Sequence, residues 1–235
     1  MKNLLFFIFL FLFFKTVKSQ QFKTSAFVSA NASFGYSKVK NSLYNKFEID
    51  PPGIGFSAAL KEEYYFQKPF SISCELMYSY VKASLRSPDS LGSLAIFTLY
   101  LQHTLFLHQL EVPFLLKWRG KKEDHNFYLF AGAGISYIFS GSKKVERIQY
   151  KYTSPKDKTI TPVSNGAFSF QNKNPVGSFM IIGLGKNFII KENKFFAEFR
   201  YRQDLSRWLY PAPYYRSNEL PVQIHSFSLS LGYTF

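Results

Sequence analysis

The sequence predicts an all-β fold, an eight-stranded antiparallel up-and-down transmembrane β-barrel, and three observations lead to it. The C-terminal residues 223–235 read QIHSFSLSLGYTF and alternate strictly between large apolar and small or polar side chains. Seven further segments of similar length repeat this period of two, and short and long connections alternate between them. Such a period gives a sheet two different surroundings on its two faces, and closure of the sheet removes its exposed edges.

The composition favours a membrane barrel over a helical membrane protein. Hydrophobic residues make up 46% of the 235 residues and aromatic residues 20%, while the mean hydropathy is only -0.10. A barrel needs apolar side chains at every second residue only, and it places aromatic residues at the two membrane interfaces. A single domain can therefore use the whole mature chain.

Residues 1–19 are predicted to be a signal peptide, which leaves residues 20–235 as the barrel domain. An early lysine, an apolar run at 4–14 and the sequence VKS at 17–19 fit a cleaved export signal. The run of about 11 residues is too short for the roughly 20 that span a bilayer. Loss of its three lysines would lower the formal net charge from +14 to about +11.

Export places the chain in the bacterial outer membrane and excludes nucleic acid as a partner. The positive charge is then expected to meet the anionic phosphates of outer-membrane lipid and lipopolysaccharide. A single cysteine, Cys74, excludes an intrachain disulfide and a cysteine-based metal site. No cofactor is expected.

The first four predicted strands cover residues 22–36, 54–66, 70–82 and 104–118. In the first, Phe27 stands on the otherwise polar face, and in the second, Glu62 interrupts the apolar face near one end. In the fourth, Pro113 cannot donate a ladder hydrogen bond, which predicts a bulge or a local break.

The last four predicted strands cover residues 127–139, 177–190, 194–205 and 223–235. The fifth and sixth strands carry a Gly-x-Gly on the polar face, at 132–134 and 183–185, which predicts room for large inward side chains such as Phe130. No helix follows these glycines, so they are not a nucleotide-binding motif. Lys186 lies on the apolar face of the sixth strand, where a side chain near the rim can reach the interface.

The connections predict the orientation of the barrel. Residues 67–69, 119–126 and 191–193 form short polar turns, whereas 37–53, 83–103, 140–176 and 206–222 are long. Outer-membrane barrels place their short turns in the periplasm. Both termini are therefore predicted to be periplasmic and the long connections to be extracellular loops.

Nine charged residues fall on the polar, lumen-facing side of the predicted strands. They are Lys61, Glu63, Glu75, Glu111, Lys117, Glu198, Arg200, Arg202 and Asp204. The interior of an eight-stranded barrel is just wide enough to be filled by side chains, and buried charges are tolerated mainly as pairs. We expect an ion-paired plug; an open lumen would instead make these residues a narrow ion-selective path.

Two of the long connections carry candidate binding residues. The basic ones are Lys143, Lys144, Arg147, Lys151, Lys156 and Lys158, and the aromatic ones are Trp208 and Tyr210. The cations suit lipopolysaccharide phosphates or an acidic surface partner, and exposed aromatic residues suit an envelope protein. The alternatives are a solvated basic loop and aromatic residues packed on the barrel mouth.

The terminal strand is expected to face lipid with one side. The residues on that side are Phe227, Leu229, Leu231, Tyr233 and Phe235. No catalytic site is expected, because His225 and Ser226 are neighbours on one strand and point to opposite faces. His103 and His108 could approach a loop serine, but no spacing supports a catalytic pair.

Several segments together resemble the small outer-membrane β-barrel proteins of Bacteroidetes, the PorT-like group. They are LEVPFLLK at 110–117, YLFAGAG at 128–134, GLG at 183–185, LGYTF at 231–235 and a signal peptide ending before Gln20. The resemblance spans the mature chain and implies a barrel whose terminal aromatic pattern is read by the barrel-assembly machinery. The member that gives the group its name belongs to a secretion apparatus.

These observations predict a plugged barrel that acts in surface binding or as an accessory to an envelope or secretion complex. The alternatives are a small passive channel, an outer-membrane lipid hydrolase and a soluble ligand-binding barrel. Conductance, hydrolase turnover and partitioning into an aqueous phase without detergent would distinguish them.

Overall fold

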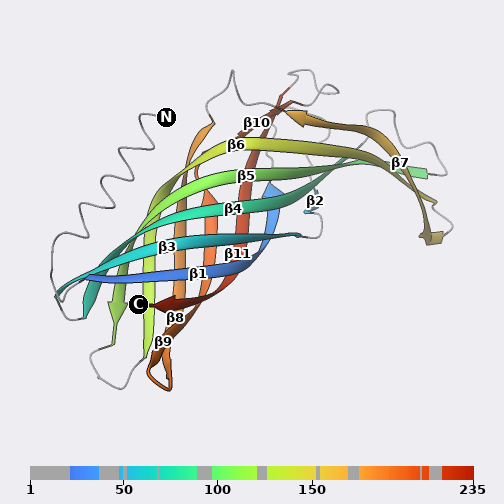
Figure 1. The fold of residues 1–235 in the computed structure, drawn as a ribbon. Helices are drawn as coiled ribbons and strands as arrows, with labels where there is room; N and C mark the ends of the chain where they lie inside the picture. The colour runs from blue at the N-terminus through green and yellow to red at the C-terminus, as the bar shows by residue number, and fades with distance from the viewer. Residues whose placement is uncertain are drawn as a thin grey trace.

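A computed structural model describes residues 22–36, 48–49, 52–67, 69–88, 97–120, 126–151, 154–168, 175–206, 208–211 and 219–235. The regular secondary structure within these ranges is β-strand (Figure 1). None of the described residues forms a helix that is long and apolar enough to span a membrane. The expected signal peptide at residues 1–19 lies outside the described ranges.

The strands, numbered as in Figure 1, are β1 (Phe22–Tyr36), β2 (Glu48–Ile49), β3 (Gly53–Gln67), β4 (Phe70–Pro88), β5 (Phe97–Arg119), β6 (Phe127–Lys151), β7 (Ser154–Phe168), β8 (Val176–Ile190), β9 (Asn193–Asp204), β10 (Trp208–Pro211) and β11 (Glu219–Thr234). Eight of them follow one another around the molecule in the order β1, β3, β4, β5, β6, β8, β9, β11. Antiparallel pairing of β1 with β11 closes the ring. The predicted eight-stranded antiparallel barrel is therefore confirmed.

The register of the ladders fixes the shape of the barrel. A path of Cα partners that leaves β5 at His108 and passes once around the ring returns to β5 at Trp118, ten residues further along. With eight strands, this shear corresponds to a strand tilt of about 40°, and the interior is just wide enough for side chains to fill.

Strand alternation separates an apolar outside from a mostly polar inside. On β11, Leu229 and Leu231 are 58% and 57% exposed, while Ser230 between them is fully buried. The same contrast recurs on the other barrel strands, for example at Ile182 on β8 and Phe114 on β5. A continuous apolar outer surface of this kind is stable in lipid and not in water.

Three irregularities predicted from the sequence have local explanations. The β4–β5 pairing stops at Cys74 opposite Phe114 and resumes at Met77 opposite Glu111, so the ladder is interrupted around Pro113 without a change of register. Phe27 points inward and is only 4% exposed. On the outer face, Glu62 accepts a hydrogen bond of 2.8 Å from Thr24. This pair lies near the end of the barrel where the short turns join the strands, which we call the turn end.

The prediction of long loops at residues 83–103 and 140–176 was wrong over much of their length. β4 continues to Pro88, β5 begins at Phe97, β6 continues to Lys151, and β7 pairs with β6 over Ser154–Phe168. Figure 1 shows β5 and β6 running well past the ends of β1 and β3, on the side where β7 lies. We refer to residues 83–88 of β4, 97–103 of β5, 140–151 of β6 and 154–168 of β7 as the projecting sheet.

Bulges explain why alternation in the projecting sheet escaped the sequence pattern. The β5–β6 register shifts between His108 and Gln109, and the β6–β7 register shifts between Val145 and Glu146. Each extra residue reverses which side of the strand an apolar group occupies. On β6 the extra residue is Phe139, and as a result Ile138 and Gly141 on either side of it are both buried although their spacing is odd.

Candidate functional site: the charged lumen

The nine charged side chains that the sequence places in the lumen meet inside the barrel. Lys61 and Glu63 come from β3, Glu75 from β4, Glu111 and Lys117 from β5, and Glu198, Arg200, Arg202 and Asp204 from β9. None is more than 7% exposed. They share the inner face because every second residue of a strand points to the same side.

Glu198 is the centre of this group. Its Oε1 accepts hydrogen bonds from Lys61 Nζ at 3.0 Å, Lys117 Nζ at 3.3 Å and the Tyr128 hydroxyl at 2.7 Å. Arg200 Nε donates to the other carboxylate oxygen at 2.9 Å. Together, these donors replace the water that a buried carboxylate loses.

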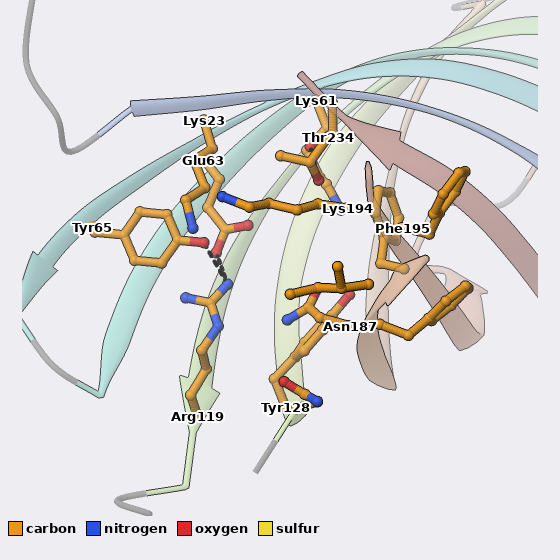
Figure 2. A pocket seen from close by; sticks show the side chains of 15 residues that line it. Lys23, Lys61, Glu63, Tyr65, Arg119, Tyr128, Asn187, Lys194, Phe195 and Thr234 are labelled. Atoms are coloured by element: carbon orange, nitrogen blue, oxygen red, sulfur yellow. Dashed lines mark hydrogen bonds and ion pairs between the residues drawn. The ribbon is translucent and has the colours of Figure 1, made fainter. Parts of the chain in front are cut away.

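Arg119, the last residue of β5, extends the network toward the turn end. Its Nη2 donates to Glu63 Oε1 at 2.6 Å and to the Tyr65 hydroxyl at 2.7 Å (Figure 2). Lys117 Nζ lies 3.5 Å from the other oxygen of Glu63. Arg119 was not predicted as a lumen residue because residue 119 was assigned to a turn. Had the strand been extended by two residues beyond Lys117, alternation would have placed Arg119 on the same inner face.

With Arg119 included, the lumen charge network contains equal numbers of cations and carboxylates. The cations are Lys61, Lys117, Arg119, Arg200 and Arg202, and the carboxylates are Glu63, Glu75, Glu111, Glu198 and Asp204. Each of the ten lies within 4 Å of an opposite charge. The formal charges of this network therefore sum to zero.

Two arginines on β9 pair with carboxylates further from the turn end. Arg200 makes a two-point contact with Glu75, at 2.6 Å and 2.9 Å, which is the geometry in which a guanidinium binds a carboxylate best. Arg202 Nη2 lies 2.8 Å from Asp204 Oδ1, and its Nε lies 3.4 Å from Glu111 Oε2.

Aromatic rings fill the space between the charged groups. Lys61 Nζ lies 3.5 Å from the centroid of the Phe196 ring, and the Arg200 guanidinium lies 4.5 Å from that of Phe27. A cation over a ring face is attracted by the ring quadrupole, more so where water is excluded. Phe27 stands on the polar face of β1 because it packs against this cation.

The inward glycines make room for the rings, as the sequence predicts. A Cβ atom at Gly183 would collide with the Phe130 ring, and one at Gly185 would collide with the Tyr128 ring. Both rings are 3% exposed. The Gly-x-Gly on β8 thus lets two large side chains of β6 lie flat against the neighbouring strand.

A layer of apolar side chains lies further from the turn end than the charges. Its buried members are Val81, Ala83, Leu105, Leu107, Ile138, Val145, Val222 and Ile224. His103, on the part of β5 that belongs to the projecting sheet, is also buried, at 2% exposure. Burial, together with the nearby Lys143 ammonium, lowers the pKa of His103 to about 4, so this imidazole is neutral at pH 7.

Cavities interrupt the packing of the described part of the lumen, and two of them adjoin charged residues. The larger, of about 280 Å³, lies at the turn end beside Arg119 and Tyr65 (Figure 2). The smaller, of about 30 Å³, lies near Arg202 and Glu111. A space of that size holds little more than ordered water.

The structure distributes the surface-binding candidates over strands. Lys143, Lys144, Arg147 and Lys151 lie on β6, Lys156 and Lys158 on β7, and Trp208 and Tyr210 on β10. Lys143 and Arg147 are partly buried. Lys144, whose side chain is 43% exposed, forms an ion pair of 2.7 Å with Glu146. The side chains of the other five lie outside the described residues.

The outward side of β11 carries the five residues expected to face lipid. Phe227, Leu229, Leu231 and Phe235 are exposed, and Tyr233 is half-exposed. Phe227 stacks on Phe199 of β9 at 5.9 Å between ring centroids. On the same outer surface, His225 Nδ1 lies 2.8 Å from the Tyr201 hydroxyl and His108 Nδ1 lies 2.8 Å from that of Tyr78.

A closed barrel with an apolar outer surface and a charged interior is an outer-membrane β-barrel protein. Residues 18–208 match the family model described as outer membrane protein beta-barrel domain, and the chain belongs to that family. The protein is accordingly located in the bacterial outer membrane. A search of curated protein sequences finds no match.

Solved structures with a similar fold include Ail, the attachment invasion locus protein of Yersinia pestis, with 12% identity over 92% of this chain and 100% of that chain and a TM-score of 0.38. Neisserial surface protein A shows 11% identity over 90% and 97% of the two chains, with a TM-score of 0.39. A major outer membrane protein from Thermus thermophilus shows 10% identity over 90% and 99%, with a TM-score of 0.41.

Proposed function

We propose that this protein is a non-conducting, non-enzymatic outer-membrane barrel that acts by binding at the cell surface or as an accessory to an envelope or secretion complex. The lumen charge network carries the proposal. Its ten charges pair with one another and leave few free groups to conduct an ion. The apolar layer on the extracellular side adds a second barrier, because a hydrophobic constriction excludes water.

The binding role is assigned to the projecting sheet. Lys144 and Arg147 lie on β6 beyond the apolar band, and the other four basic candidates lie on β6 and β7 as well. Cations there suit the phosphates of lipopolysaccharide or an acidic surface partner. The membrane lipid itself surrounds the apolar outer surface of the barrel.

The finer assignment follows the sequence resemblance. We propose that the chain is one of the PorT-like small barrels of Bacteroidetes, that residues 1–19 are a cleaved signal peptide, and that the barrel-assembly machinery reads LGYTF at 231–235. The motifs at 110–117 and 128–134 support this group. Within the motif at 110–117, Glu111 and Lys117 lie on the lumen face.

A small passive channel is the second candidate. The 280 Å³ cavity at the turn end favours it, because the lumen is hollow over that part of its length. An outer-membrane lipid hydrolase has less support, since His108 is bound to Tyr78 on the outer face and His103 is buried. Among the described residues, no group of three His, Cys, Asp or Glu side chains could hold a metal ion.

The surface-binding role is tested with the barrel in nanodiscs and purified lipopolysaccharide as the ligand. Each surface cation contributes about 1 kcal/mol to binding an anionic lipid surface, so Lys144→Gln/Arg147→Gln should weaken binding roughly tenfold or more. Lys191→Gln, which removes one charge at the opposite end, is the control and should leave binding unchanged. Equal affinity of all three proteins, or equal binding of dephosphorylated lipopolysaccharide, would contradict the role.

A further inference from the structure

A cavity with several charged lining residues opens at the turn end, which is the end that we expect to face the periplasm. It has a volume of about 280 Å³, and its lining comes from seven barrel strands, among them β1 with Lys23, β9 with Lys194 and β5 with Arg119. Figure 2 shows these side chains converging on one space beside Tyr65. The lumen charge network forms its inner end at Lys61 and Glu63.

The charges around this cavity are not balanced. Lys23, Lys194 and Arg119 surround it, and Glu63 is the carboxylate that lines it. Lys61 also reaches the cavity, but Glu198 neutralises it at 3.0 Å. Lys23 and Lys194 form no ion pair with any carboxylate of the described residues, so the cavity carries a formal excess of two positive charges. The lumen charge network at the inner end of the cavity, by contrast, has equal numbers of cations and carboxylates.

Two of the cations are held in place before any ligand arrives. Lys23 Nζ lies 4.6 Å from the centroid of the Tyr65 ring, and the Arg119 guanidinium lies 4.4 Å from the same centroid. Arg119 is fixed further by its hydrogen bonds to Glu63 and the Tyr65 hydroxyl. A site whose donors are already positioned loses less conformational entropy on binding.

One wall of the cavity is apolar. Ile189 of β8 and Phe196 of β9 line it with inward side chains, and the Tyr128 ring forms part of its inner end. Asn187 adds a polar group on that side. The volume is at the lower limit of the roughly 300–1,000 Å³ typical of small-molecule sites, so an occupant must be compact.

We propose that this cavity binds a small amphipathic anion from the periplasmic side, a phosphate or carboxylate group carried on a compact apolar body. Lys23 and Lys194 contact the anionic group, and the wall of Ile189, Phe196 and Tyr128 contacts the body. The site is separate from the projecting sheet, and it does not depend on what the barrel binds at the cell surface.

The experiment uses the full mature barrel, labelled with ¹⁵N and held in a nonionic maltoside detergent that brings no anion. Phenyl phosphate, benzoate and neutral benzyl alcohol are titrated in turn while amide shifts are followed. Phenyl phosphate or benzoate should shift amides around Lys23, Asn187 and Lys194 saturably, with a Kd below about 1 mM. Benzyl alcohol should bind at least about tenfold more weakly.

Two variants test the role of the cations. Lys23→Gln/Lys194→Gln should weaken anion binding by about tenfold or more, whereas Lys144→Gln on the projecting sheet should leave it unchanged. Both lysines are exposed, and the faster gel mobility of the unheated barrel verifies that the double variant is folded. Binding of one anion and not the other would support the proposal and identify the head group. Absence of saturable shifts, equal binding of benzyl alcohol, or unchanged affinity in the double variant would overturn it.

Discussion

At the scale of single residues, Glu198 determines how the lumen is organised. It accepts hydrogen bonds from two lysines, a tyrosine and an arginine, which come from β3, β5, β6 and its own strand β9. A buried ion pair adds little stability compared with an apolar pair of similar size, but loss of one partner leaves the others buried and uncompensated. The network therefore penalises alternative arrangements of the strands more than it stabilises the observed one.

Glu198→Gln should lower the free energy of unfolding by about 3–5 kcal/mol, because Lys61 loses its carboxylate partner and Lys117 keeps only Glu63. Reversible urea unfolding in lipid vesicles, followed by tryptophan fluorescence, measures the effect. The control is Glu146→Gln, which breaks the exposed pair with Lys144 and should cost less than about 1 kcal/mol. A similar, small effect of both substitutions would mean that the lumen is hydrated and the charges are screened.

The sequence predicted which residues point into the lumen but not which of them pair. Alternation alone places Lys61, Glu111 and Arg200 on the inner face. The partner of each charge depends on the shear of the barrel, which sets the strands at different heights, and no local pattern encodes that number. Arg119 was missed for a simpler reason, since the boundary between a strand and a turn is uncertain by a few residues.

At the scale of elements, the strands that cross the membrane were predictable and the projecting sheet was not. Residues on β11 or β9 alternate without a bulge, so their inner and outer faces follow from the sequence. On β6 the alternation reverses near Phe139, where the register with β5 shifts. A search for a strict period of two fails at such positions, and the basic residues there suggested a loop instead.

The orientation of β11 predicts the cost of a charge at its centre. Leu229→Arg should destabilise the barrel by about 2–4 kcal/mol, because an arginine at mid-depth must be transferred into lipid. Phe235→Arg, directly after the last residue of β11, should cost only about 0–1 kcal/mol since the side chain reaches the interface. Urea unfolding in vesicles measures both. A neutral effect of Leu229→Arg would show that this position does not face the membrane core.

At the scale of the whole molecule, the lumen changes character along its length. A cationic cavity lies at the turn end, ten paired charges and their aromatic neighbours fill the middle, and an apolar layer follows toward the opposite end. Pairing of β1 with β11 closes the sheet around all three zones. This sequence of zones suits a barrel that holds its lumen shut and uses its two ends for binding.

The central claim is that the filled lumen does not conduct, and planar-bilayer recording of the refolded wild-type protein tests it most directly. A preparation verified as folded by its gel mobility should insert without producing discrete current steps. Glu198→Gln in the same assay shows whether an imbalance of the network opens a path. We predict a silent wild-type protein; discrete, reproducible openings of the wild-type barrel would contradict the account.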